Sequence, residues 1–218
     1  MSSVTQSGLP GAVDTVVFDL GNVLVQWNPR FLFRKIFGAD EAAMEYFLSK
    51  VCNTEWNEQQ DCGRSWKDGI AIAARQHPEH TPHIQAYYDR WEEMIPGAIE
   101  ETVEILSQLR ALNIRLLALT NWSDETFPIA QQRFPFFGWF EGIVVSGQER
   151  LIKPDPAIFK LLIGRYQLRP ESTVFIDDSL RNVEASKAQG LHGLHFTGAD
   201  ELRRQLTALG IPLPYLPL

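Results

Sequence analysis

Five short apolar runs constrain the fold of this chain most strongly, because each has the length and character of a strand, and the first has the pattern of a fully buried one. They cover residues 15–20, 114–120, 142–146, 173–177 and 191–196. Short continuous runs of this kind, rich in Val, Ile and Leu, are typical of strands buried on both faces of a parallel sheet. Helices are predicted around and between the later runs. They cover residues 99–109, residues 123–134, a stretch that begins at residue 156, a stretch after residue 177 that ends at about residue 189, and residues 202–209. This alternation predicts an α/β fold in which helices cover both faces of a doubly wound parallel sheet.

One long segment interrupts the alternation after the first run. Residues 30–94 contain no convincing strand, are rich in aromatic, Glu and Gln residues, and show helical patterns at 40–51 and 83–94. Pro-containing segments at 26–30 and 95–99 bracket it and are typical of linkers. We therefore expect a core of residues 1–27 and 96–218, with a helical cap of residues 28–95 inserted after the first strand.

Composition and charge exclude several classes of partner. The 218 residues are 44% hydrophobic and 22% charged, with a net charge of −7 and no run of Lys or Arg, which argues against nucleic acid or an anionic membrane as a partner. No apolar run approaches the roughly 20 residues of a membrane span. Cys52 and Cys62 lack metal-ligand spacing and are expected to be reduced thiols. The N-terminus lacks the features of a secretory signal and is expected to be a flexible tail, and residues 211–218 are expected to lie along the surface. We therefore expect a cytoplasmic protein, as a monomer or weak dimer.

Polar residues cluster at the ends of the predicted strands. They are Asp19, Thr120, Asn121, Ser146, Asp177 and Asp178, and Lys153 lies in the loop after the third run. In an open parallel sheet the carboxyl ends of the strands form the ligand-binding edge. Three carboxylates that meet there are hard to keep ionised without a cation, and Mg²⁺ is the usual choice where phosphate also binds. Each residue taken alone could be a helix cap, a turn or a surface side chain, but their joint occurrence indicates a site.

Four segments carry a family resemblance. FDLGNVL, LTNWS, KPDP and FIDDSLRN resemble the four motifs of the haloacid dehalogenase superfamily, and most closely its capped subgroup with sugar-phosphate phosphatases of the glucose-1-phosphate type. The resemblance spans the chain from Val16 to about Phe196. It implies a Rossmann-like core with a cap inserted after the first strand. It also implies a Mg²⁺-dependent phosphatase that hydrolyses a small phosphorylated metabolite, such as a sugar phosphate.

The resemblance assigns the nucleophile and the metal ligands. Asp19 matches the carboxylate that attacks phosphorus and becomes an aspartyl phosphate. Together with Asp19, the backbone carbonyl of Gly21 and the pair Asp177 and Asp178 match the metal ligands. Asp178 is expected to bind the metal directly and Asp177 through water.

The resemblance also assigns the groups that bind the phosphoryl group. Thr120 matches the hydroxyl that binds it, and Asn121 helps to orient it. Lys153 would neutralise charge on the phosphoryl oxygens and keep Asp19 ionised. Asn182 could brace the acidic loop or be a helix-surface residue.

One departure from the family pattern limits this interpretation. Many of these phosphatases carry a second Asp two residues after the nucleophile, as a general acid and base, and here that position is Gly21. An easily departing leaving group, an acid from the cap or a weakened enzyme would each explain it. Two other functions stay open: a 2-haloacid dehalogenase with the same Asp nucleophile, which needs no metal, and a catalytically weak regulatory or binding protein.

The cap offers candidates for substrate contact. They are Trp56, Gln59, Gln60, Arg64 and Trp66, together with Trp27 and Asn28 in the first linker. The alternative is that the aromatic residues among them form the small core of the cap itself. The five His residues lie outside the four motifs and are expected at the surface.

Overall fold

Five parallel strands form one sheet in the computed structural model, which describes residues 12–213. They are β1 Thr15–Phe18, β2 Arg115–Thr120, β3 Gly142–Val145, β4 Thr173–Asp177 and β5 His192–His195. Their order across the sheet is β3-β2-β1-β4-β5, and every neighbouring pair is parallel. All five predicted strands are confirmed, although β1 ends two residues earlier than expected. The predicted N-terminal tail up to residue 11 and the last five residues, 214–218, lie outside the described range.

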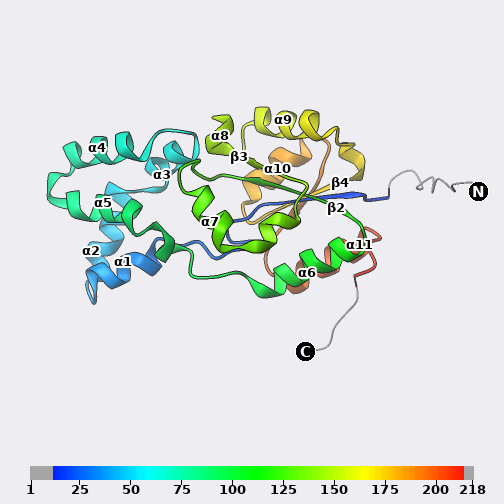
Figure 1. Cartoon of the computed structure of the whole chain (residues 1–218), viewed down its shortest axis with the longest axis horizontal. Coiled ribbons are helices and arrows are strands. Elements are labelled where there is room, and N and C mark those ends of the chain that lie inside the picture. Colours follow the sequence, from blue (N-terminus) through cyan, green and yellow to red (C-terminus); the bar gives the residue numbers. More distant parts are fainter. Residues whose placement is uncertain (1–11, 214–218) are drawn as a thin grey trace, which may run out of the picture.

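Helices surround the sheet and extend from one end of it (Figure 1). The α-helices are α1 Arg30–Phe37, α2 Glu41–Tyr46, α3 Thr54–Asp61, α4 Trp66–Gln76, α5 Thr81–Asp89, α6 Glu100–Ala111, α7 Phe127–Arg133, α8 Ser146–Glu149, α9 Pro156–Tyr166, α10 Leu180–Lys187 and α11 Ala199–Ala208. Within residues 12–213, no helix is long and apolar enough to cross a membrane.

Both faces of the sheet are buried, which confirms the doubly wound arrangement. Successive strand residues point to opposite faces. Val17 therefore belongs to a cluster with Phe159 of α9, whereas Val16 belongs to a second cluster with Ile105 of α6 and Leu202 of α11. Helices α9 and α10 accordingly cover one face, and α6 and α11 cover the other (Figure 1).

Every regular element between Arg30 and Met94 is helical, as expected for the inserted segment. These helices lie together beyond one end of the sheet (Figure 1). The two linkers run side by side, since Gln26 N donates to Gly97 O and Asn28 N donates to Met94 O, both over 2.9 Å. The two linkers that join the core to the helical segment are therefore hydrogen-bonded to each other. The boundaries at 27/28 and 95/96 stay a prediction.

Three predicted helices differ in extent from those observed. The 40–51 helix is α2 followed by a π-helical turn at Phe47–Val51, and the 83–94 helix is α5 followed by a 3₁₀ turn at Trp91–Met94. The predicted 123–134 helix begins only at Phe127, with Pro128 in its first turn, where a missing N–H is tolerated. Residues 121–126 instead form a loop that faces the inserted helices.

Candidate active site

The strand order places three polar strand ends at one edge of the sheet. β1 lies between β2 and β4, and Phe18 is in register with Ala118 on one side and Ile176 on the other. The next residue, Asp19, therefore lies beside the ends of both neighbouring strands. Thr120 ends β2 and Asp177 ends β4. The chain changes direction across the sheet between β1 and β4, and such switch points are where open α/β sheets bind ligands.

Lys153 connects the nucleophile candidate to the acidic pair. Its ammonium lies 3.0 Å from Asp19 Oδ1 and 2.7 Å from Asp177 Oδ2, and it donates to the carbonyl of Leu119 over 3.0 Å. The lysine is only 2% exposed and Asp177 is fully buried. A buried ammonium is stable only with such partners. The predicted association of Lys153 with Asp19 is therefore present.

Asn121 positions the lysine loop. Its Oδ1 accepts from Lys153 N over 2.9 Å, and its Nδ2 donates to Lys153 O over 3.0 Å. This two-point clamp joins the loop after β2 to the loop that carries Lys153. Asn121 also lines the cavity described below. The resemblance implied that Asn121 orients the phosphoryl group, whereas its observed contacts orient Lys153.

The three carboxylates are close enough to share a metal ion. Asp19, Asp177 and Asp178 each offer one oxygen, and these oxygens lie within 4.8 Å of one another. Asp177 is held by Asn182 Nδ2, at 3.0 and 3.1 Å from its two oxygens, and by the N–H of Ser179. Asn182 thus braces the acidic loop. Asp178 is exposed and lines the cavity, which is consistent with its expected place as the direct ligand.

Electrostatics at this edge favour a bound cation. Burial raises the pKa of Asp19 to about 7, and Lys153 offsets only part of that rise. Burial, followed by the charge of Asp177, also raises the pKa of Asp178. Burial lowers the pKa of Lys153, but the charges of Asp177 and Asp19 outweigh it, so the net shift is upward. Three clustered carboxylates and one ammonium leave excess negative charge, and an all-oxygen donor set suits Mg²⁺.

Gly21 lines the cavity two residues beyond Asp19. No atom lies within 4 Å of the position that a Cβ would occupy there. Asn22 follows in the left-handed region with φ 53°, and its Oδ1 accepts from Trp27 N over 3.0 Å. That turn brings Trp27 to the same cavity. The Gly21 carbonyl as a metal ligand stays a prediction.

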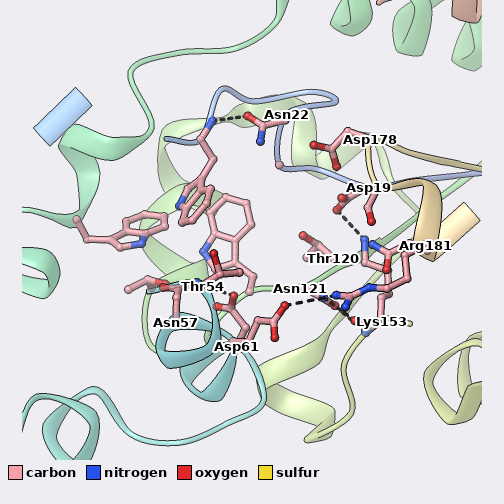
Figure 2. Close-up of a pocket in the computed structure, with 18 residues that line it drawn as sticks. Asp19, Asn22, Thr54, Asn57, Asp61, Thr120, Asn121, Lys153, Asp178 and Arg181 are labelled. Carbon is pink, nitrogen blue, oxygen red and sulfur yellow. Dashed lines mark hydrogen bonds and ion pairs between the residues drawn. The ribbon is translucent and has the colours of Figure 1, made fainter. Parts of the chain in front are cut away.

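A cavity of about 270 Å³ lies above these residues, between the sheet edge and the inserted helices (Figure 2). Asp19, Gly21, Thr120, Asn121, Lys153 and Asp178 line it. Helix α3 contributes Thr54, Asn57, Glu58 and Asp61, which lie three or four residues apart and therefore share one face of the helix. Trp27, Trp91 and Trp122 add an apolar wall.

Most of the predicted cap contacts are wrong: three of the five cap residues are buried inside the helical segment, and the exposed Gln59 and the loop residue Arg64 do not line the cavity. Trp56, Gln60 and Trp66 are at most 9% exposed and pack inside the helical segment. Gln60 Nε2 donates to Trp56 O, and Arg64 donates to the same carbonyl. None of these four, nor Gln59, lines the cavity.

In the first linker, Trp27 is confirmed as a cavity residue, whereas Asn28 accepts from Arg30 N at the start of α1 and does not line the cavity. Ser146 is structural: its Oγ accepts from Trp122 N and donates to Asp61 O.

The cavity-lining residues of α3 were visible in the sequence as a group with helical spacing, at positions 54, 57, 58 and 61. That spacing identifies a shared face but not which face meets the site.

Comparison with known proteins agrees with these observations. A family model described as haloacid dehalogenase-like hydrolase matches residues 13–190. Acyl-CoA dehydrogenase family member 10 from Mus musculus is 32% identical over 220 residues, covering 91% of this chain but 19% of that protein. Sesquiterpene phosphatase astK from Aspergillus oryzae is 25% identical over 189 residues, 83% of this chain and 88% of that protein. The chain thus spans little of the mouse relative and most of the fungal one.

Solved structures show the same fold. A HAD family enzyme from Bacteroides thetaiotaomicron, in complex with magnesium and inorganic phosphate, has a TM-score of 0.65 at 20% identity. The match covers 84% of this chain and 94% of that one. Dehalogenases also share the fold, with TM-scores of 0.61 to 0.65 at 14 to 15% identity. Because the family model covers most of the chain and the motif residues converge at one site, this protein belongs to the haloacid dehalogenase-like hydrolases.

Proposed function

We propose that this hydrolase is a Mg²⁺-dependent phosphatase that hydrolyses a small phosphomonoester through an aspartyl phosphate. One observation carries the proposal. The carboxylate of Asp19 lies at the base of a cavity, paired with the buried Lys153 and within reach of the same cation as Asp177 and Asp178. An acidic trio of this kind suits chemistry in which a metal and an anionic group meet.

Each side chain then has a defined task. Asp19 attacks phosphorus with a carboxylate oxygen, which forms an intermediate that water can hydrolyse. Lys153 favours the ionised form of Asp19 and faces the developing negative charge, while the hydroxyl of Thr120 donates a hydrogen bond to a phosphoryl oxygen. Mg²⁺ bound by the acidic trio, with the Gly21 carbonyl as a further ligand, would supply positive charge beside the phosphoryl oxygens.

The relatives support phosphoryl chemistry. The fungal relative that this chain matches over most of its length is a sesquiterpene phosphatase, and the solved Bacteroides enzyme binds magnesium and inorganic phosphate. The dehalogenase alternative shares the fold but requires no metal. It therefore leaves the convergence of Asp177 and Asp178 on Asp19 without a purpose.

The cavity favours a substrate with an apolar face. Trp27, Trp91 and Trp122 line it, with the rings of Trp91 and Trp122 centred 5.5 Å apart. Indole rings pack against the C–H face of a sugar or against a hydrocarbon chain. A volume of about 270 Å³ suits a small metabolite. Sugar phosphates and short hydrocarbon phosphates are accordingly the classes to test first, and a cytoplasmic monomer or weak dimer remains our expectation.

A substrate screen tests this function. Sugar phosphates, an alkyl phosphate and an aryl phosphate are assayed with Mg²⁺ and with EDTA, for the wild type, Asp19→Asn and the exposed control Asp200→Asn. We expect Mg²⁺-dependent release of phosphate that Asp19→Asn abolishes and Asp200→Asn preserves. Metal-independent release of halide from 2-haloacids would instead establish the dehalogenase. Mg²⁺ binding without turnover of any phosphate would establish the regulatory alternative.

A further inference from the structure

Hydrolysis of a phosphomonoester requires two proton transfers that the groups described so far do not perform. The ester oxygen must gain a proton as its bond to phosphorus breaks, and the attacking water must lose one in the second half of the reaction. Gly21, next but one to Asp19, has no side chain for either transfer. The donor must therefore come from another wall of the cavity.

Six lining side chains can carry a charge: Asp19, Glu58, Asp61, Lys153, Asp178 and Arg181. Four of them cannot act as the proton donor, because each already has another role, fixed ion-pair partners or a permanent charge. Asp19 is the nucleophile, Asp178 belongs to the acidic trio, and Lys153 is held by two buried carboxylates. Arg181 stays protonated throughout the pH range of proteins.

The two carboxylates of helix α3 that line the cavity, Glu58 and Asp61, remain, and their surroundings differ. Glu58 forms an ion pair with the guanidinium of Arg181 at 3.5 Å, so it already has a cationic partner. Asp61 is held by a neutral group, because Asn57 Nδ2 donates to its Oδ2 over 2.9 Å. Asp61 therefore has no cationic partner among the contacts described, and its carboxyl group stays available to give and take a proton.

The main chain of Asp61 is fixed to the core. Its carbonyl accepts from Oγ of Ser146, the first residue of α8, over 2.5 Å. Two residues later, a Cβ at Gly63 would lie 2.9 Å from the carbonyl of Gly147, so the chain approaches the core as closely as a glycine permits. In Figure 2, Asp61 reaches the cavity from the helical segment and Asp19 reaches it from the sheet. The two carboxyl groups thus line one cavity, Asp61 from the helical segment and Asp19 from the sheet.

We propose that Asp61 is the catalytic acid and base of this site, taking the place of the side chain missing at Gly21. This inference rests on the proposed phosphatase function. In the first step Asp19 Oδ bonds to phosphorus, the bond from phosphorus to the ester oxygen breaks, and that oxygen takes the carboxyl proton of Asp61 and leaves as an alcohol. In the second step water bonds to phosphorus, gives its proton to the Asp61 carboxylate, and the bond from phosphorus to Asp19 breaks.

The protonation behaviour of Asp61 agrees with this sequence. Burial raises its pKa to about 7, and the nearby charge of Glu58 adds to the rise, while the backbone of Ser123 opposes it. A carboxyl group with a pKa near the working pH is populated in both forms, which suits a group that alternates between acid and base. The other charged groups around the cavity are Arg181 of α10, Lys153, Asp19 and Asp178.

The test varies the leaving group. Asp61→Asn keeps the size of the side chain and removes its proton. We expect kcat/KM for an alkyl phosphate to fall about 10²–10⁴-fold, and for 4-nitrophenyl phosphate to fall less than about tenfold, because nitrophenolate departs without a proton. Glu55→Gln makes the same charge change on the exposed face of α3 and should leave both values unchanged. Equal losses on both substrates, or no loss, would overturn the assignment of Asp61.

A second variant separates chemistry from folding. Adding Gly21→Asp to Asp61→Asn places a carboxyl group where a side chain has free space, and we expect it to restore turnover of the alkyl phosphate at least about tenfold. A structural defect at Asp61 would not respond to a change at Gly21, so failure of this rescue counts against the proposal. A wild-type protein inactive on every phosphate refutes the phosphatase function itself, whereas an active one with a uniform Asp61→Asn loss refutes Asp61 alone.

Discussion

Replacing Lys153 with Met should destabilise the protein strongly, because it leaves two buried carboxylates without their cation. Met is similar in length and fills the same space without charge. The ammonium that is lost contacts Asp19 at 3.0 Å, Asp177 at 2.7 Å and the carbonyl of Leu119 at 3.0 Å. Removing one partner of a buried ion pair typically costs about 3–5 kcal/mol. Because Asp177 keeps its contacts with Asn182, we expect a loss within that range rather than above it.

That loss is large against the total stability of a domain, which is about 5–15 kcal/mol. In a protein of this size each kcal/mol shifts Tm by about 2–4 °C, so Lys153→Met should lower Tm by roughly 6–20 °C. Urea unfolding in EDTA, followed by tryptophan fluorescence and circular dichroism, measures the free energy directly. Lys187→Met, at a half-exposed pair with Glu184, should change it by less than about 0.5 kcal/mol. A Lys153→Met loss below about 1 kcal/mol would refute the reasoning that the buried lysine offsets the carboxylates.

Four further outcomes follow from the site. Mg²⁺ at 100 times its Kd should stabilise the wild type by about 2.7 kcal/mol, and Asp178→Asn should abolish that shift in a thermal melt. Asn182→Ala, which frees Asp177, should weaken Mg²⁺ affinity about 10–100-fold by calorimetry, and an unchanged affinity would exclude the bracing role. Trp27→Ala should raise KM more than it lowers kcat in steady-state assays. The pKa of Asp61 is raised in the folded state, so its contribution to stability is full below about pH 4 and lost as pH rises through about 7. Asp61→Asn should reduce the slope of stability against pH in urea titrations, and the part that Asp19 contributes should remain.

Much of the fold and site could be predicted from local sequence signals. The apolar runs identified all five strands, because the apolar character of a strand is a property of consecutive residues, although β5 is only half-buried. The helix predicted from residue 156 onward begins at Pro156, where Asp155 Oδ1 accepts from Ala157 N. Helix ends were less predictable, as the late start of α7 shows, because they depend on what the neighbouring loop contacts.

The contacts of the inserted helices could not be predicted in the same way. Trp56 and Gln60 are large side chains that can form hydrogen bonds, and they were candidates for substrate contact. They lie inside the helical segment instead. Asp61 lies on the same helix and was not singled out. Amphipathic spacing shows that a helix has two different faces, but the docking of that helix determines which face meets the site.

The sequence by itself therefore determined the alternation of strands and helices, the family, and the polar residues that end each strand. These depend on short-range pattern and on motifs whose members lie close together in the chain. Only the tertiary structure decided that Lys153 bridges Asp19 and Asp177, that Asn121 clamps the lysine loop, and that α3 brings Asp61 to the cavity that Asp19 lines. Those contacts join residues 24 to more than 130 positions apart, and only packing of the whole chain brings them within hydrogen-bond distance or to the same cavity.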